Sequence, residues 1–198
     1  MTWLEDNLVY KYIAGIDEVG RGPIFGPVIA CSIIMPQNKY IDGINDSKKL
    51  SEKKRLLLND QIWKEAIAIG IGVASSKEID EINIKNASKM AMVRAYNNMI
   101  LFKRPDLVIV DFENPKLDNF VLSVKKGDEI SYNVACASIV AKVYRDNLCS
   151  IWDYYYPNYD IKKNKGYGTK SHISSLFKYG ESDLHRKTFL RKIYERTK

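Results

Sequence analysis

The chain has few of the residues that disulfide, thiol or imidazole chemistry requires. Its 198 residues include three cysteines and two histidines. Cys31, Cys136 and Cys149 are odd in number, far apart and set in apolar or helical surroundings, which predicts buried, reduced thiols in an intracellular protein. His172 and His185 have no partner at metal-ligand spacing, so we interpret them as structural or phosphate-adjacent. The sequence shows no Ser-His-Asp or Cys-His pattern.

Long hydrophobic runs are also absent. No stretch of 18 apolar residues exists, and residues 1–11 carry acids where a signal peptide would be basic and then apolar. There is no Pro/Ser-rich linker and no internal repeat. We therefore expect a cytoplasmic protein without membrane contact, built as one domain with a basic C-terminal appendage.

Basic residues outnumber acidic ones by 31 to 24, giving a formal charge of +7 and a pI near 9.1. This excess favours an anionic partner, with nucleic acid as the leading candidate and a solubilising surface as the alternative. The 45% hydrophobic content can supply a core, which excludes a disordered basic tail.

Apolar runs and helix-start signals predict five strands and several helices. Strands are expected over residues 12–16, 28–35, 67–73, 107–110 and 120–124. One helix is expected after Ser51 and a long one from the Ser75/Glu78 capping box to Pro105. Further helices are expected over residues 133–154, 172–179 and 184–196.

Two of these strands lead into carboxylates. The first ends at Asp17 and Glu18, followed by a turn rich in glycine and proline, and the fourth ends at Asp111. Two strands that deliver an acid from the same end can lie side by side and bring Asp17 and Asp111 within reach of one metal ion. The alternative is a pair of solvated turns, because turns collect Asp and Gly for conformational reasons. The helix over 133–154 is rich in small residues, so we expect it to pack closely beneath the acids.

The stretch GIDEVGRGPIFGPV resembles the signature of the ribonuclease HII family, the bacterial type 2 ribonucleases H. The similarity continues through NDSKKLSEKKR, EIDEINI, PDLVIVD, KKGDEISYNVACASIVAKVYRD, NKGYGTKSH and HRKTF, in the family's order. It implies an α/β, RNase H-like fold: a five-stranded mixed sheet flanked by helices. Residues 1–156 would form the catalytic domain and residues 157–198 a C-terminal helical extension packed on it.

The resemblance also implies an activity and a metal site. The family cleaves RNA in RNA/DNA hybrids and at ribonucleotides embedded in duplex DNA, by two-metal hydrolysis leaving 3′-hydroxyl and 5′-phosphate ends. Its catalytic and metal-binding acids, which hold two Mn²⁺ or Mg²⁺ ions, fall on Asp17, Glu18, Asp111 and Asp128. Asp146 competes for the fourth place, but beside Arg145 in a helix it is expected to form a structural pair.

Substrate recognition is implied for a second set of residues. The family's Gly-Arg-Gly motif falls on Gly20, Arg21 and Gly22, and its junction-sensing tyrosine on Tyr167. Glycine backbone can approach a ribose 2′-hydroxyl, the arginine can reach a phosphate, and the tyrosine can stack on a sugar. The expected contacts to the nucleic-acid backbone are Lys48, Lys165 and Lys170.

One departure and three alternatives remain open. The family usually has glycine after the third acid, where this chain has Phe112 and Glu113; this departure concerns the backbone path after Asp111 and not the ligand itself. The alternatives are an RNase H-like nuclease acting on DNA branches, a ribonuclease HIII, for whose extra N-terminal domain the chain lacks the length, and a hybrid-binding module without catalysis. We expect a monomeric enzyme acting on nucleic acid.

Overall fold

The computed structural model describes residues 2–37 and 39–195, which fold around one mixed sheet. Its strands, in the spatial order β3-β2-β1-β4-β5, are β1 (Ile13–Val19), β2 (Val28–Ile34), β3 (Ala68–Ala74), β4 (Leu107–Asp111) and β5 (Val121–Val124). β2 pairs antiparallel with β1 and β3, whereas β4 pairs parallel with β1 and β5. The predicted five-stranded mixed sheet is confirmed.

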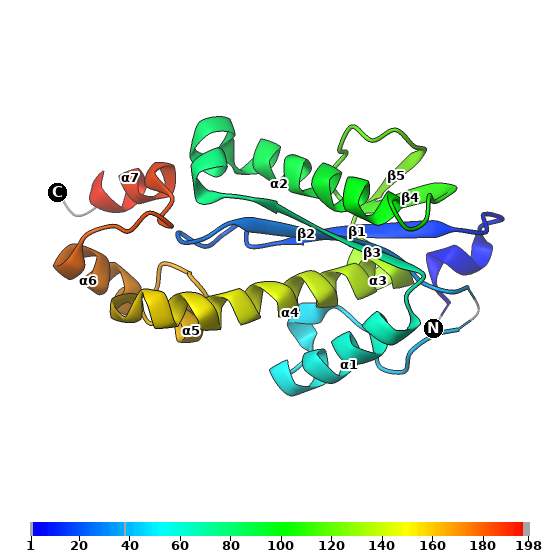
Figure 1. The fold of residues 1–198 in the computed structure, drawn as a ribbon, viewed down its shortest axis with the longest axis horizontal. Coiled ribbons are helices and arrows are strands. Elements are labelled where there is room, and N and C mark those ends of the chain that lie inside the picture. The colour runs from blue at the N-terminus through cyan, green and yellow to red at the C-terminus, as the bar shows by residue number, and fades with distance from the viewer. Residues whose placement is uncertain (1, 38, 196–198) are drawn as a thin grey trace.

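Helices cover both faces of this sheet (Figure 1). α2 (Ser76–Ile100) lies on one face, and α4 (Tyr132–Tyr155) and α1 (Glu52–Glu65) lie on the other. α6 (Lys170–Tyr179) and α7 (Lys187–Glu195) gather at one end of the molecule. The shorter elements are α3 (Gly127–Ile130), α5 (Ile161–Asn164) and three 3₁₀ turns, η1 (Leu4–Asn7), η2 (Ser47–Lys49) and η3 (Pro157–Tyr159).

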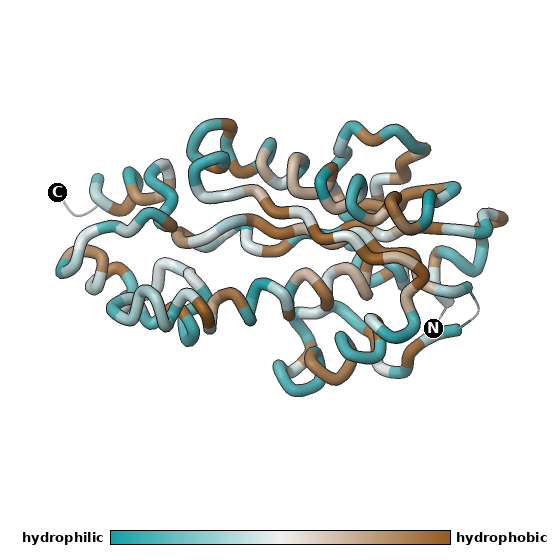
Figure 2. The backbone as a smooth tube through the Cα atoms, in the orientation of Figure 1, coloured by the Kyte–Doolittle hydropathy of each residue, from teal (hydrophilic) through white to brown (hydrophobic). Residues whose placement is uncertain are grey.

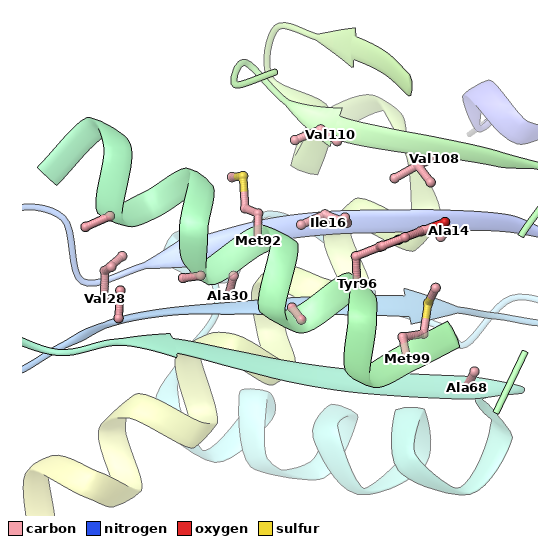
Figure 3. Packing of buried hydrophobic residues seen from close by; sticks show 14 of the residues in the cluster. Ala14, Ile16, Val28, Ala30, Ala68, Met92, Tyr96, Met99, Val108 and Val110 are labelled. Carbon is pink, nitrogen blue, oxygen red and sulfur yellow. The ribbon is translucent and has the colours of Figure 1, made fainter. Parts of the chain in front are cut away.

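The core forms where apolar strands meet the apolar sides of α2 and α4. Every residue of β2 is buried, as the nearly continuous apolar run predicts for a central strand. Hydrophobic residues therefore concentrate along the strands and polar ones on the outer helix surfaces (Figure 2). On the α2 side, Met92, Tyr96 and Met99 point onto the sheet (Figure 3).

The other face allows an unusually close helix approach. A Cβ atom added at Gly15 of β1 would lie 2.2 Å from the carbonyl carbon of Asn133 in α4, so only glycine fits there. The first turns of α4 consequently pack directly against the central strand. The small residues along this helix predicted that packing.

The end of one predicted strand and the continuity of one predicted helix are wrong for local reasons. β1 does not stop before its acids, because Asp17 and Glu18 still pair with Cys31 and Ala30 of β2. α2 is not one unbroken helix: Asn83 has φ 66° and ψ 163°, and its side-chain oxygen accepts a hydrogen bond from the N–H of Asn86 at 3.1 Å. Asn83 thus interrupts the helix and caps its second segment.

The C-terminal helices differ slightly from prediction. The last one begins at Lys187, not at residue 184, because His185 first forms a β-bridge with Phe25; its predicted end at residue 196 lies outside the described residues. All three cysteines are buried and unpaired, as predicted. Among the residues that the structure describes, no helix has the length and apolarity needed to cross a membrane.

Candidate active site

The structure brings Asp17 and Asp111 to neighbouring positions on one face of the sheet. β1 and β4 run parallel with Ile16 beside Val110, and each acid is the next residue on its strand. Ile16 and Val110 pack in the cluster beneath α2, so strand alternation places both acids on the opposite, α4 side. The expected juxtaposition of two strand-end acids is therefore present.

Asp17 is buried in this position, 8% exposed. Burial is the main cause that raises the pKa of Asp17 well above its ordinary value, and the charges of Glu18 and Asp111 raise it further. A hydrogen bond from Ser138 of α4 opposes the shift. The site therefore confines negative charges that repel one another.

Glu18 occupies the other face of β1, toward α2. Its Oε1 accepts a hydrogen bond from Arg21 Nη1 at 3.1 Å, and the same nitrogen lies 3.0 Å from Oε1 of Glu113. Burial raises the pKa of Glu18, although the bond from Arg21 works against this. Arg21, predicted to reach a phosphate, is here held between two carboxylates.

Asp128 lies in α3 beside a further acid, Asp46. Burial raises the pKa of Asp128, followed by the charges of Asp46 and Asp111, while Lys48 opposes the shift. Burial lowers the pKa of Lys48, but the charges of Asp128, Asp17, Asp46 and Asp111 together outweigh it and raise that pKa. The predicted fourth acid and Lys48 thus both lie at the acid cluster.

Several oxygens of this cluster are occupied within the protein. Asp17 Oδ1 accepts from the N–H of Glu18 at 2.8 Å, and Asp111 Oδ1 accepts from the N–H of Gly127 at 2.7 Å. Within residues 2–37 and 39–195, no three Asp, Glu, His or Cys side chains are grouped closely enough to form a ready-made metal site. The acids are neighbours, but their side chains are oriented by internal hydrogen bonds.

Arg186, a fully buried residue, fixes the Gly-Arg-Gly turn through hydrogen bonds to backbone carbonyl groups. Its guanidinium donates to the carbonyl oxygens of Gly20 at 2.6 Å, Arg21 at 3.0 Å and Gly26 at 2.8 Å. In a trans peptide the N–H points away from the C=O, so these bonds turn the N–H groups of Arg21 and Gly22 away from Arg186. Neither N–H has a hydrogen-bond partner in the described part of the chain.

Tyr167 lies directly against this turn. A Cβ atom added at Gly22 would be 3.2 Å from the Tyr167 ring, and the tyrosine is 49% exposed. The N–H of Ile24 donates to the carbonyl of Gly166 at 2.9 Å, joining the two loops. The structure therefore unites the two predicted recognition elements, which are far apart in sequence.

Both histidines are buried behind the Tyr167 loop. The N–H of Ser182 donates to Nδ1 of His185 at 2.9 Å, which leaves the proton of His185 on Nε2. That Nε2 lies 3.1 Å from Nε2 of His172, whose Nδ1 can then donate to the carbonyl of Tyr167 at 2.9 Å. The interpretation of the histidines as structural is confirmed.

The remaining predicted residues lie around the site. Lys165 and Lys170 stand on either side of the Tyr167 loop, and neither forms an ion pair with the four acids in the described residues. Asp146 is paired, as predicted, with Lys142 at 2.6 Å and Arg55 at 3.7 Å, whereas its neighbour Arg145 donates to the carbonyl groups of Lys165 and Phe25. Phe112 adopts φ 55°, the left-handed region that glycine favours, at the position where the family usually has glycine.

Sequence reasoning missed four residues of this site: Asp46, Glu113, Ser138 and Arg186. From the sequence, Asp46 could be recognised only as a residue of a polar turn, and Ser138 only as a small residue of a helix. Their roles depend on contacts between distant segments, such as the bond between the hydroxyls of Ser47 and Ser138 at 2.9 Å. The motif HRKTF contains Arg186, but nothing local indicates which carbonyl groups it binds.

Comparisons with known proteins agree with this geometry. The ribonuclease HII family model matches residues 14–197. Ribonuclease HII of Alkaliphilus metalliredigens is 50% identical over 188 residues, covering 93% of this chain and 92% of its own length. Ribonuclease HII of Bacillus subtilis is 50% identical over 186 residues, covering 94% and 72%.

Solved structures show the same fold. Ribonuclease H2 from Pyrococcus horikoshii superposes with a TM-score of 0.77 at 26% identity, over 93% of this chain and 98% of that one. Bst-RNase HIII, determined in complex with Mn²⁺, has a TM-score of 0.67 at 17% identity, over 90% and 67%. Together with the mixed sheet and its neighbouring acids, the family match and these relatives show that the chain belongs to the ribonuclease HII family and is a ribonuclease H enzyme.

Proposed function

We propose that this ribonuclease H cleaves RNA in RNA/DNA hybrids and at single ribonucleotides embedded in duplex DNA. The contact between Tyr167 and Gly22 carries this proposal, because it joins a half-exposed aromatic ring to backbone N–H groups that have no hydrogen-bond partner among the described residues. A ribose 2′-hydroxyl is the group that distinguishes RNA from DNA, and it can both donate and accept hydrogen bonds. The turn offers hydrogen-bond donors to this hydroxyl, and the ring offers a surface on which a sugar can stack.

The metal site is proposed at Asp17, Glu18, Asp111 and Asp128. Carboxylate oxygens are the donors that Mg²⁺ and Mn²⁺ prefer. Burial, followed by the charges of Glu18 and Asp111, raises the pKa of Asp17, and bound cations would stabilise its charged form against both effects. Two such ions supply an activated water, neutralisation of the phosphoryl oxygens and stabilisation of the leaving oxygen. Their number and identity are part of the proposal.

The chain's own residues then position the substrate. Arg21 has donors left for a phosphate, and Lys48, whose charge interacts with those of Asp128, Asp17 and Asp111, adds positive charge at the proposed site of cleavage. Lys165 and Lys170 are proposed to contact the nucleic-acid backbone on the Tyr167 side. Because water is the attacking group, the products carry 3′-hydroxyl and 5′-phosphate ends.

A duplex with one ribonucleotide, incubated with Mg²⁺ or Mn²⁺ beside an all-DNA duplex, tests the proposal. We expect one nick at the ribonucleotide and none in the DNA control. Equal cleavage of both duplexes would favour the DNA-directed alternative. We further propose that the enzyme acts as a monomer in the cytoplasm, which sedimentation and fractionation can check.

A further inference from the structure

Glu113 is a buried acid that the proposed mechanism does not use. It is 5% exposed, and its two oxygens have separate cationic partners. Oε1 lies 3.0 Å from Nη1 of Arg21, and Oε2 lies 3.8 Å from Nζ of Lys89 in α2. Because Nη1 of Arg21 also binds Glu18, Glu113 and Glu18 share one guanidinium.

A tight turn delivers Glu113 to this place. The N–H of Glu113 donates to the carbonyl of Asp111 at 2.5 Å, closing a three-residue turn around Phe112 at φ 55°. Turns of this hydrogen-bonding pattern with a positive central φ are rare and strained, and strain persists where the surroundings fix it. The N–H of Phe112 is itself held by the carbonyl of Val124 at 2.7 Å. The backbone thus bends immediately after Asp111 and turns Glu113 back into the site.

We propose that Glu113 is a positioning residue that keeps Arg21 beside the acid cluster when Glu18 is engaged by cations. This inference rests on the proposed function. Arg21 has two anchors in the structure, and one of them, Glu18, belongs to the proposed metal-binding set. Once Glu18 directs its charge to cations, those cations repel the guanidinium, and Glu113 becomes the anchor that remains.

The geometry leaves Arg21 able to bind substrate while anchored. A guanidinium has five N–H donors, and Nη1 uses its two on the carboxylates. In the described residues Nε and Nη2 of Arg21 have no hydrogen-bond partner, so their three donors are left for a phosphate. The position of Lys89 on the second oxygen of Glu113 limits the freedom of that carboxylate.

Glu113→Gln tests this role because it keeps the shape and removes the charge. With the single-ribonucleotide duplex we expect KM to rise about fivefold to tenfold and kcat to stay within about twofold. In an Arg21→Gln background the same substitution should change KM by less than about twofold, since its effect passes through Arg21. Glu65→Gln makes the same chemical change at a more exposed acid, which pairs with Lys39 outside the site; this control variant should have the KM and kcat of the wild type.

A second readout does not depend on cleavage. The Nε–H resonance of Arg21, assigned by its loss in Arg21→Lys, should stay sharp with Mg²⁺ in the wild type and broaden or vanish with Mg²⁺ in Glu113→Gln. An unchanged resonance in Glu113→Gln, or an equal rise in KM with and without Arg21, would overturn the inference. A wild type that leaves the ribonucleotide duplex intact refutes the proposed function, and the resonance comparison then still decides the role of Glu113.

Discussion

Asp17 is a buried carboxylate whose nearest charged neighbours are also acids, so its ionised form destabilises the metal-free protein. We predict that Asp17→Asn abolishes cleavage, by about 10³-fold or more, because one proposed ligand loses its charge. In EDTA the same variant should be more stable than the wild type, by about 1 kcal/mol, because a buried charge and its repulsion by Glu18 and Asp111 are removed. Steady-state kinetics and urea unfolding measure the two effects.

Asp146→Asn is the matched control for this substitution. Asp146 is equally buried, 7% exposed, but is paired with Lys142 and Arg55. Removing its charge leaves cations unpaired and should lower the free energy of unfolding. If both variants lower the free energy of unfolding, the buried charge of Asp17 does not destabilise the metal-free protein.

Tyr167 can be tested by truncation. Tyr167→Phe keeps the ring that contacts Gly22, whereas Tyr167→Ala removes it. We predict that Tyr167→Ala loses about tenfold to a hundredfold in kcat/KM at the single ribonucleotide, and that Tyr167→Phe loses much less, because stacking of a ring is worth about 1–3 kcal/mol. Equal rates for both variants would exclude a stacking role.

His172 and His185 form a buried pair that must stay neutral. Burial, followed by the neighbouring His172, lowers the pKa of His185 to about 4. As pH falls, the unfolded chain binds a proton near its ordinary pKa of about 6.5, before the folded chain does. Stability is therefore fully present above about pH 6.5 and is lost as pH falls towards about 4. Urea unfolding at pH 7, 6 and 5 should show this loss.

His185→Gln separates this loss from other titrations. Glutamine can accept from Ser182 and donate to His172, but it does not titrate. Its stability at pH 7 should be lower than that of the wild type, and its decline between pH 7 and 5 smaller. A variant that declines as steeply would assign the pH dependence to other groups.

At the residue scale, the sequence predicted those site residues whose positions depend on their neighbours along the chain. Asp17 and Asp111 follow apolar runs, so strand chemistry alone indicated their common edge. Asp46 and Glu113 could not be found in that way, because each reaches the site through a turn that is bonded to a distant segment of the chain. Glu113 depends on the bond between Phe112 and Val124, which no short stretch encodes.

At the scale of elements, the turn after β4 holds an aromatic residue in a conformation suited to glycine. Phe112 is 65% exposed, so its side chain gains little from burial. We predict that Phe112→Gly raises the free energy of unfolding by about 0.5–1 kcal/mol, because glycine adopts φ 55° without the steric cost. Thermal or urea unfolding measures the change.

Phe120→Gly provides the comparison for that turn. Phe120 is 67% exposed and has no positive φ, so glycine there only adds freedom to the unfolded chain and should destabilise. A destabilised Phe112→Gly would show that the strain is outweighed by contacts of the ring.

The sequence predicted that the helix α2 exists and where it begins, but it did not predict that the helix is interrupted. Ser75 and Glu78 start α2 through the predicted capping box, with the N–H of Ser75 bonded to Glu78 at 2.8 Å. The interruption at Asn83 was missed because asparagine inside a helical pattern is tolerated, and its capping conformation shows only in three dimensions.

For the whole molecule, Arg186 joins the C-terminal segment to the turn that begins near residue 20. We predict that Arg186→Lys raises KM for the single-ribonucleotide duplex about tenfold and lowers stability by about 2 kcal/mol. An ammonium group cannot reach the three carbonyls that the planar guanidinium binds. Kinetics with the ribonucleotide duplex and unfolding in urea measure both changes.

A specific outcome separates positioning from general stability in Arg186→Lys. If KM is unchanged at a temperature where the variant is folded, the turn does not need Arg186 to present its N–H groups.

The division into a catalytic part, 1–156, and an extension, 157–198, stays a prediction. Contacts such as those of Arg186 and the bridge between Phe25 and His185 hold the two parts together.

The bonds of Arg186 to Gly20, Arg21 and Gly26 also set an order of events during biosynthesis. A ribosome makes the turn around Gly20 early, but Arg186 follows Gly26 by 160 residues. The turn therefore leaves the exit tunnel before the arginine that binds its carbonyl groups has been synthesised.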